Sequence, residues 1–294
     1  VEPQVDRPGS RAGRSRNGRI MTNVVAAEPQ QRMPGAGFTE SVVDAAGFSV
    51  RYLSAGDGPT LLYLPGAGGP VMTFALDALA ERFRVIVLEF PGWGAQPNDV
   101  ADFDGLAAQV EEIATALQLE RFHLMGTSFG GACAMHFVAA FPDRVESLVL
   151  EAPGKLREAS VHPSTLSPEE FVKAFRSHPE RVPHMSPPDP AFMQRVWPTV
   201  ERLMGDGTDG GLLARLAEVP TRTLILWGRD DGIINPINGR ALRRTMRNSS
   251  LQYVFDAAHD IQCDRPEAFV DVVGDFLDRG MRFLINYDDG LINP

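Results

Sequence analysis

The chain has 294 residues, of which 44% are hydrophobic and 22% charged, so it can bury a large core and is not disordered throughout. Its 28 Lys and Arg against 38 Asp and Glu give a net charge of −10, which argues against nucleic acid as the main partner. No apolar run reaches the ~18 residues that span a bilayer, and two cysteines are too few for a disulfide framework. We therefore expect a cytoplasmic protein with no membrane segment.

The N-terminal residues differ in composition from the rest of the chain. The stretch from Arg7 to Arg19 is rich in Gly, Ser and Arg, and it has no apolar periodicity. This composition is typical of a disordered segment, and the apolar stretch of a secretory signal is absent from it. We expect residues 1–36 to be a disordered extension, and we interpret residues 1–20 as an upstream-start or added segment that activity does not need.

From about residue 38, short apolar runs alternate with longer helical patterns, which indicates a βαβ architecture with a parallel sheet. The first two runs are short and alternating, which favours an antiparallel start. The expected strands are Ser41–Asp44, Ser49–Leu53, Thr60–Leu64, Arg84–Glu89, Phe122–Met125, Glu146–Glu151, Thr221–Trp227 and Leu251–Phe255. Apolar residues at helical spacing predict helices around 106–117 and 269–277, and we expect Asp264 to be the N-cap of the second.

Residues 155–220 interrupt the alternation and are called the insertion below. They hold 9 of the 23 prolines and contain no expected strand. A capping box at Ser167–Glu170 and the pair Asp189-Pro190 predict helix starts. We therefore expect an α/β fold with a mostly parallel sheet of about eight strands, flanked by helices, and a helical cap inserted after the sixth strand. Its core would be 37–154 and 221–280, with a C-terminal tail at 281–294.

The segment Gly126-Thr127-Ser128-Phe129-Gly130 has the pattern G-x-S-x-G, preceded by an expected strand and followed by an expected helix. A sharp strand-to-helix turn exposes the serine hydroxyl at the helix N-terminus, where negative charge is stabilised. The pattern therefore predicts Ser128 as a nucleophile. The alternative is a tight turn that carries a solvated serine.

With this motif and the order of its elements, the chain resembles the α/β-hydrolase superfamily from about residue 40 to 280. The resemblance implies a serine, an acid and a histidine in that chain order. The acid matches Asp231, in the Gly228-Arg229-Asp230-Asp231 turn, and the histidine matches His259, after the last expected strand. The imidazole would remove the Ser128 proton, and the carboxylate would hold the imidazole tautomer.

Two rivals for the acid stay open. Asp230 is adjacent to Asp231, although its side chain should point another way, and Glu151 ends the strand before the insertion, where some relatives carry the acid. The five other histidines are expected to be structural or solvated; they are His123, His136, His162, His178 and His184.

The resemblance also implies an oxyanion hole formed by two backbone N–H groups. By position these are Phe129, directly after the nucleophile, and Ala67, in the loop Leu64–Gly69. Relatives usually have His-Gly in that loop, whereas this chain has Pro65-Gly66. We expect Gly66 and Gly68 to border the substrate. Trp93, in the Pro91–Gly94 turn, is interpreted either as a pocket residue or as a packed surface aromatic.

These residues predict a cofactor-independent serine hydrolase that cleaves an ester, lactone, thioester or amide of a small, largely apolar substrate through an acyl-enzyme. The first alternative is a carbon–carbon bond hydrolase of the meta-cleavage-product type. Those relatives usually have an aromatic residue after the histidine, but here Asp260 follows His259. The second alternative is a non-catalytic hydrolase-fold binder of a small molecule.

We expect no metal and no cofactor, and the chain would be a monomer or homodimer that binds neither nucleic acid nor membrane. Cys133 and Cys263 do not have metal-site spacing and are expected to be inert. The C-terminal residues 288–294 repeat residues 230–236 at six of seven positions, for which we have no physical account.

Overall fold

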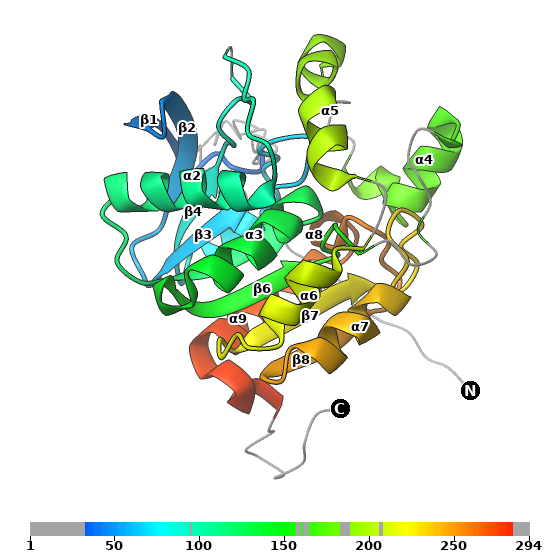
Figure 1. Cartoon of the computed structure of the whole chain (residues 1–294). Helices are drawn as coiled ribbons and strands as arrows, with labels where there is room; N and C mark the ends of the chain where they lie inside the picture. Colours follow the sequence, from blue (N-terminus) through cyan, green and yellow to red (C-terminus); the bar gives the residue numbers. More distant parts are fainter. Residues whose placement is uncertain are drawn as a thin grey trace, which may run out of the picture. The chain divides into compact units, whose positions relative to one another are not determined.

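The computed structural model describes residues 33–94, 96–156, 160, 165–182, 189–205 and 208–284. Within these residues eight strands form one sheet in the order β1-β2-β4-β3-β5-β6-β7-β8 (Figure 1). The strands are β1 Thr39–Ala45, β2 Phe48–Ala55, β3 Thr60–Leu64, β4 Arg84–Leu88, β5 Phe122–Thr127, β6 Val145–Glu151, β7 Thr223–Gly228 and β8 Ser249–Val254. From β4 to β8 every neighbouring pair is parallel. The expected fold class, a mostly parallel sheet of about eight strands flanked by helices, is confirmed.

The sheet begins with an antiparallel hairpin, as the alternating pattern predicted. β1 pairs with β2, and β2 then pairs antiparallel with β4. The turn between β1 and β2 has Ala46 at φ 53° and Gly47 at φ 79°. Two successive positive φ values match the twist of a two-residue hairpin turn, so the turn sets the strand register.

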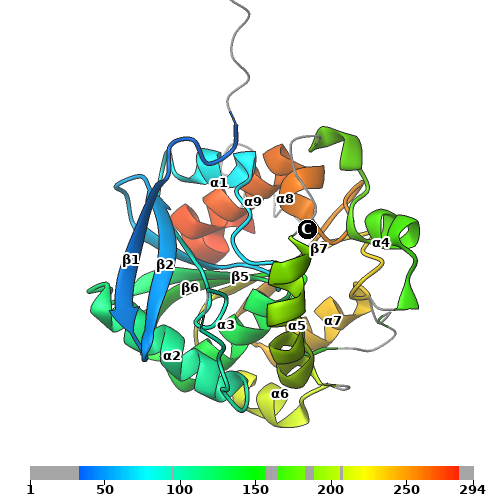
Figure 2. The same cartoon turned by 90° about the horizontal axis from the view of Figure 1, so that it is seen from above.

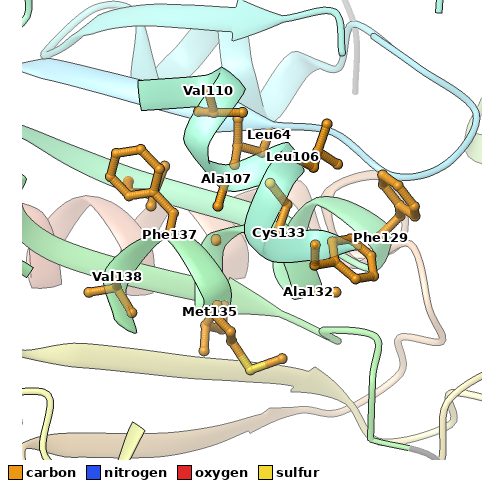
Figure 3. Close-up of a cluster of buried hydrophobic side chains, with 14 of the residues drawn as sticks. Leu64, Leu106, Ala107, Val110, Phe129, Ala132, Cys133, Met135, Phe137 and Val138 are labelled. Carbon is orange, nitrogen blue, oxygen red and sulfur yellow. The ribbon is translucent and has the colours of Figure 1, made fainter. Parts of the chain in front are cut away.

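Helices cover both faces of the sheet (Figure 2). One face packs against α2 Phe103–Ala116, α3 Phe129–Ala140 and α7 Ile237–Thr245, and the other against α1 Phe74–Leu79 and α9 Pro266–Arg279. Figure 3 shows the first of these cores, where Leu106 and Val110 of α2 lie near Leu64 and the buried residues of α3. Because α3 is buried almost all round, the residue directly before it, Ser128, has a rigid support.

The described part of the insertion is helical. It contains α4 Pro168–Phe175, α5 Pro190–Met204, α6 Gly210–Leu216 and the 3-10 turn Pro179–Arg181. The Ser167 capping box forms, and the Asp189 side chain accepts the N–H of Ala191 at 3.0 Å, so both predicted helix starts are confirmed. The Gly232 N–H donates to the Ala174 carbonyl at 3.0 Å. This bond joins α4 to the loop after β7.

The predicted N-cap role of Asp264 is wrong. α9 begins at Pro266 with Arg265 in the N-cap position, where no side chain caps the helix. Asp264 instead ends the short helix α8 Ile261–Asp264, and its buried carboxylate accepts the N–H groups of Ser177, His178 and Ala258 at 2.8–2.9 Å. Three backbone donors from outside α9 bind the carboxylate and leave it no role at the α9 terminus.

Two predicted features fall outside the described residues: the N-terminal extension as far as residue 32, and the C-terminal repeat at 288–294. The described chain starts at Met33 with a turn in which the Gly35 N–H donates to the Asp77 carboxylate at 3.1 Å. No helix within the described ranges is long and apolar enough to cross a membrane.

Candidate active site

Ser128 lies in a strained turn between β5 and α3. Its φ of 53° and ψ of −113° are unusual for a residue with a side chain. Two backbone bonds hold the turn: the Ser128 N–H donates to the Glu151 carbonyl at 3.0 Å, and the Ser128 carbonyl accepts the Gly154 N–H at 2.8 Å. The side chain is half-buried at the helix N-terminus. This is the geometry that G-x-S-x-G predicts for an activated serine.

The glycines of the motif are needed for space. A Cβ on Gly126 would lie 2.4 Å from the carbonyl oxygen of Gly130, and one on Gly130 would lie 2.0 Å from the carbonyl oxygen of Leu64. Both distances are far inside van der Waals contact with backbone, which cannot move aside cheaply. The turn therefore fits only with glycine at these two positions.

His259 and Asp231 form a buried pair. Nδ1 of His259 lies 2.8 Å from Oδ2 of Asp231, and His259 is 2% exposed. The Asp231 carboxylate also accepts the N–H groups of Ile233 at 2.8 Å and Ile234 at 2.9 Å, and the Trp227 indole N–H at 3.1 Å. Because the carboxylate accepts, Nδ1 carries the proton and Nε2 of the neutral ring is left as an acceptor.

The pair favours a protonated imidazole. Burial lowers the pKa of His259, but the negative charge of Asp231, its hydrogen bond and the negative charges of Glu151 and Asp260 together outweigh burial, so the pKa stands above its ordinary value. An imidazolium that forms during proton transfer is therefore stabilised here.

The three predicted residues follow different strands of the same parallel sheet. Ser128 follows β5, Asp231 follows β7, and His259 follows β8. Parallel strands end at the same edge, so all three lie along one edge of the sheet. Asp231 occupies Nδ1 of His259, whereas Asp230 is exposed and Glu151 binds Thr127 and Gln262.

The loop after β3 runs beside Ser128. A Cβ on Gly66 would lie 3.8 Å from the Cβ of Ser128, whereas Gly68 is exposed and a Cβ there would contact nothing within 4 Å. The Gly66 carbonyl accepts the Gly69 N–H at 3.0 Å. Because the C=O and N–H of one trans peptide point in opposite directions, this turn aims the Ala67 N–H away from Gly69.

Trp93 supports this loop from the core. Its indole N–H donates to the Ala67 carbonyl at 3.0 Å, and the residue is 1% exposed. Its ring lies 5.3 Å from those of both Phe90 and Phe129. The side chain is packed in the interior, so the interpretation as a surface aromatic is wrong. The indole supplies a hydrogen bond to a loop that lacks the family's usual histidine.

The insertion brings an aromatic residue to the histidine, a contact that the sequence analysis did not predict. The Phe175 ring, at the end of α4, packs 5.3 Å from the His259 ring. The Phe175 carbonyl accepts the Asp260 N–H at 3.0 Å, and Arg176 Nε binds the Asp260 carboxylate at 2.7 Å. These two bonds to Asp260, the residue after His259, hold the Phe175 ring against the imidazole. No local pattern in the sequence predicts this contact.

The remaining histidines and cysteines have ordinary surroundings. His123 and His136 are buried, and burial lowers the pKa of each; His178 binds Glu180 at 3.0 Å, and His162 and His184 lie outside the described residues. Burial raises the pKa of the Cys133 and Cys263 thiols, so neither is a thiolate near neutral pH. Across the residues that the structure describes, no cluster of three acidic, histidine or cysteine side chains could hold a metal ion.

The alpha/beta hydrolase family model matches residues 61–272. The chain belongs to the alpha/beta hydrolase family. This alpha/beta hydrolase is an enzyme of the hydrolase type, and its family acts on small-molecule substrates.

One relative and two solved structures are similar to this chain. The 2-hydroxy-6-oxo-6-phenylhexa-2,4-dienoate hydrolase of Comamonas testosteroni is 26% identical over 268 residues, which cover 80% of this chain and 93% of the relative. The solved structure of the same-named hydrolase from a Rhodococcus species has a TM-score of 0.69 at 21% identity and covers 82% of this chain and 99% of that one. The structure of a membrane phospholipase A, described as a bacterial virulence factor, has a TM-score of 0.67 at 25% identity. The match covers 83% of this chain and 87% of the phospholipase.

Proposed function

We propose that this alpha/beta hydrolase is a cofactor-independent serine hydrolase in which Ser128 is the nucleophile, His259 the base and Asp231 the acid. The observation that carries the proposal is the 2.8 Å bond between His259 and Asp231, at the sheet edge that also holds the strained Ser128 turn. The mechanism requires the Ser128 hydroxyl to come within hydrogen-bond reach of Nε2 of His259. That nitrogen is the acceptor left free for the purpose by the Asp231 contact.

The proposed reaction cleaves an acyl bond in two steps, acylation of Ser128 and then hydrolysis of the acyl-serine. The Ser128 oxygen attacks a substrate carbonyl carbon while His259 takes the hydroxyl proton, and the N–H groups of Phe129 and Ala67 receive the developing oxyanion. His259 then gives the proton to the leaving group, which departs and leaves an acyl-serine. Water, deprotonated by His259, releases the carboxylic acid and restores the serine.

We further propose that the insertion is a cap over this site. Two backbone bonds support the proposal, from Gly232 to Ala174 and from Asp260 to Phe175, both at 3.0 Å. They attach the end of α4 to the residues that follow Asp231 and His259. The Phe175 ring would then form an apolar wall beside the base, which suits a small, largely apolar substrate.

Two bond types fit this site. The first is an ester, lactone, thioester or amide, for which an activated serine and an oxyanion hole suffice. The second is a carbon–carbon bond beside a ketone, favoured by relatives that are named as hydroxy-oxo-dienoate hydrolases. The absence of an aromatic residue after His259 counts less against the second type, because Phe175 supplies a ring to the imidazole from α4.

A fluorophosphonate probe tests the proposed roles. We expect covalent labelling of the wild-type protein and none of Ser128→Ala; labelling that persists in the variant would refute the role of Ser128. A panel of chromogenic esters with different acyl lengths, with 2-hydroxy-6-oxo-6-phenylhexa-2,4-dienoate included, then separates the two bond types. Turnover of the dienoate with no ester turnover would assign the carbon–carbon class.

A further inference from the structure

A buried network of polar side chains lies directly behind the Ser128 turn. The Tyr63 hydroxyl, at the end of β3, donates to the Thr127 hydroxyl at 3.1 Å, and the Thr127 hydroxyl donates to Oε2 of Glu151 at 2.6 Å. The Gln262 side-chain amide donates to the same Glu151 oxygen at 2.7 Å and to the Tyr63 hydroxyl at 3.1 Å. The mechanism proposed above uses none of these groups, so the network requires its own explanation.

Glu151 joins the two halves of the proposed site. Its backbone carbonyl accepts the N–H of Ser128. Its carboxyl group accepts the hydroxyl hydrogen of Thr127, the residue before Ser128. The same carboxyl group binds Gln262, three residues after His259, on the helix that continues the histidine loop. One residue at the end of β6 thus contacts both the nucleophile turn and the base loop.

The bonds of the Gln262 side chain can be assigned from their distances. Thr73 donates to the Gln262 side-chain carbonyl at 3.1 Å, and the two amide hydrogens go to Glu151 and Tyr63, which lie nearer the amide nitrogen than the Thr127 hydroxyl at 3.5 Å. Oε2 of Glu151 therefore accepts two hydrogen bonds, whereas Oε1 has no partner among the described residues, and the side chain is fully buried. An unpartnered carboxylate oxygen in this position is unfavourable, and a proton on Oε1 removes the charge.

The surroundings of the carboxyl group support a proton there. Burial raises the pKa of Glu151 to about 7, against the lowering effect of the bonds from Thr127 and Gln262. The titratable groups that act on it or respond to it are Tyr63, His259, Asp260 and Cys263. Asp260 is itself paired with Arg176 at 2.7 Å. In its ionised form Glu151 raises the pKa of His259.

We propose that Glu151 is a positioning residue of the active site: its carboxyl group fixes the Ser128 turn relative to the His259 loop, and its charge state controls how readily His259 gives up a proton. The inference rests on the proposed function, since it requires Ser128 and His259 to be nucleophile and base. A neutral Glu151 keeps the alignment and leaves the imidazole free to deprotonate. An ionised Glu151 keeps the alignment but retains the imidazole proton.

The test is the rate constant of fluorophosphonate labelling against pH, for wild type, Glu151→Gln and Glu151→Ala. Glutamine keeps the acceptor at the Oε2 position and mimics the neutral acid, so the acid limb of the profile should move to lower pH by on the order of half a unit. Alanine removes the link between turn and loop, and the labelling rate constant should fall about 10-fold or more at every pH. The matched control is Glu146→Gln, on the same strand but bound to Arg121 at 2.8 Å and Arg222 at 2.6 Å, which should leave the profile unchanged.

The outcomes separate this inference from the proposed function. Labelling of Ser128→Ala would overturn the function itself. If Ser128→Ala is unlabelled but Glu151→Gln keeps the wild-type acid limb, or shifts it to higher pH, the inference fails and the function stands. A wild-type rate in folded Glu151→Ala would also overturn it. The glutamine arm decides the matter if the alanine variant does not fold, as judged by circular dichroism.

Discussion

We expect the carboxylate of Asp264 to contribute strongly to the free energy of unfolding. It is fully buried, and it accepts three backbone N–H groups, from Ser177 at 2.9 Å and from His178 and Ala258 at 2.8 Å. A hydrogen bond to a charged group contributes about 1.5–3 kcal/mol, and a buried donor left without a partner costs about 1–3 kcal/mol. Water can reach the two donors on the insertion once the carboxylate is gone, so we expect Asp264→Ala to lower the free energy of unfolding by about 3–5 kcal/mol.

Urea unfolding of Asp264→Ala measures this loss, provided that the slope of the transition is unchanged. The control is Asp278→Ala, whose half-exposed carboxylate pairs with Arg82 at the surface and should contribute less than about 1 kcal/mol. Hydrogen exchange of the peptide around 175–182 adds a local measurement, because the Ser177 and His178 amides lose their acceptor. A loss below about 1 kcal/mol, together with unchanged exchange, would refute this account of the carboxylate.

The remaining predictions concern the proposed site. Ser128→Ala and His259→Ala should each lower turnover on the order of 10³-fold or more, measured as kcat on the best substrate of the panel, and activity that survives either change would contradict its role. Because the base must be neutral, kcat/KM should rise with pH through the titration of His259, with a midpoint above ~6.5 that Asp231→Asn should move down; a profile flat from pH 5 to 8 would count against His259. Glu151 ionises near pH 7 in the folded protein against 4.5 unfolded, so its contribution to stability falls as pH rises through that window, by up to about 3 kcal/mol. Glu151→Gln should remove this slope in urea titrations from pH 5 to 8, and an equal slope in both proteins would contradict the assignment.

The strands and the candidate site residues were predictable because each leaves a local mark on the sequence. Strands buried on both faces are nearly continuous apolar runs, and all eight expected runs overlap an observed strand. The turn around Ser128 requires glycine at fixed offsets, for steric reasons that any chain making this turn shares. Such signals lie within a few residues of the feature that they predict.

The contacts that the sequence did not reveal join residues that are far apart in the chain. The Glu151–Gln262 bond spans 111 positions and the Ser177–Asp264 bond spans 87. In the sequence, Asp264 lies close enough to the start of α9 to be taken for its N-cap. Only the folded chain shows that backbone N–H groups from outside α9 bind its carboxylate. The Phe175 ring reaches His259 for a similar reason, since its position depends on where α4 packs.

The end of α4 has a consequence for exchanging parts between relatives. Residues 174–178, at the end of α4 and directly after it, make backbone or side-chain bonds to Gly232, Asp260 and Asp264, which follow Asp231 and His259 in the chain. A chimera that carries residues 155–220 of a relative on this scaffold would lose those bonds, unless the loops that follow β7 and β8 are replaced together with that segment. The natural unit of recombination is therefore the segment together with 228–236 and 256–265, and we expect grafts cut at the segment boundaries alone to lose catalysis before they lose their fold.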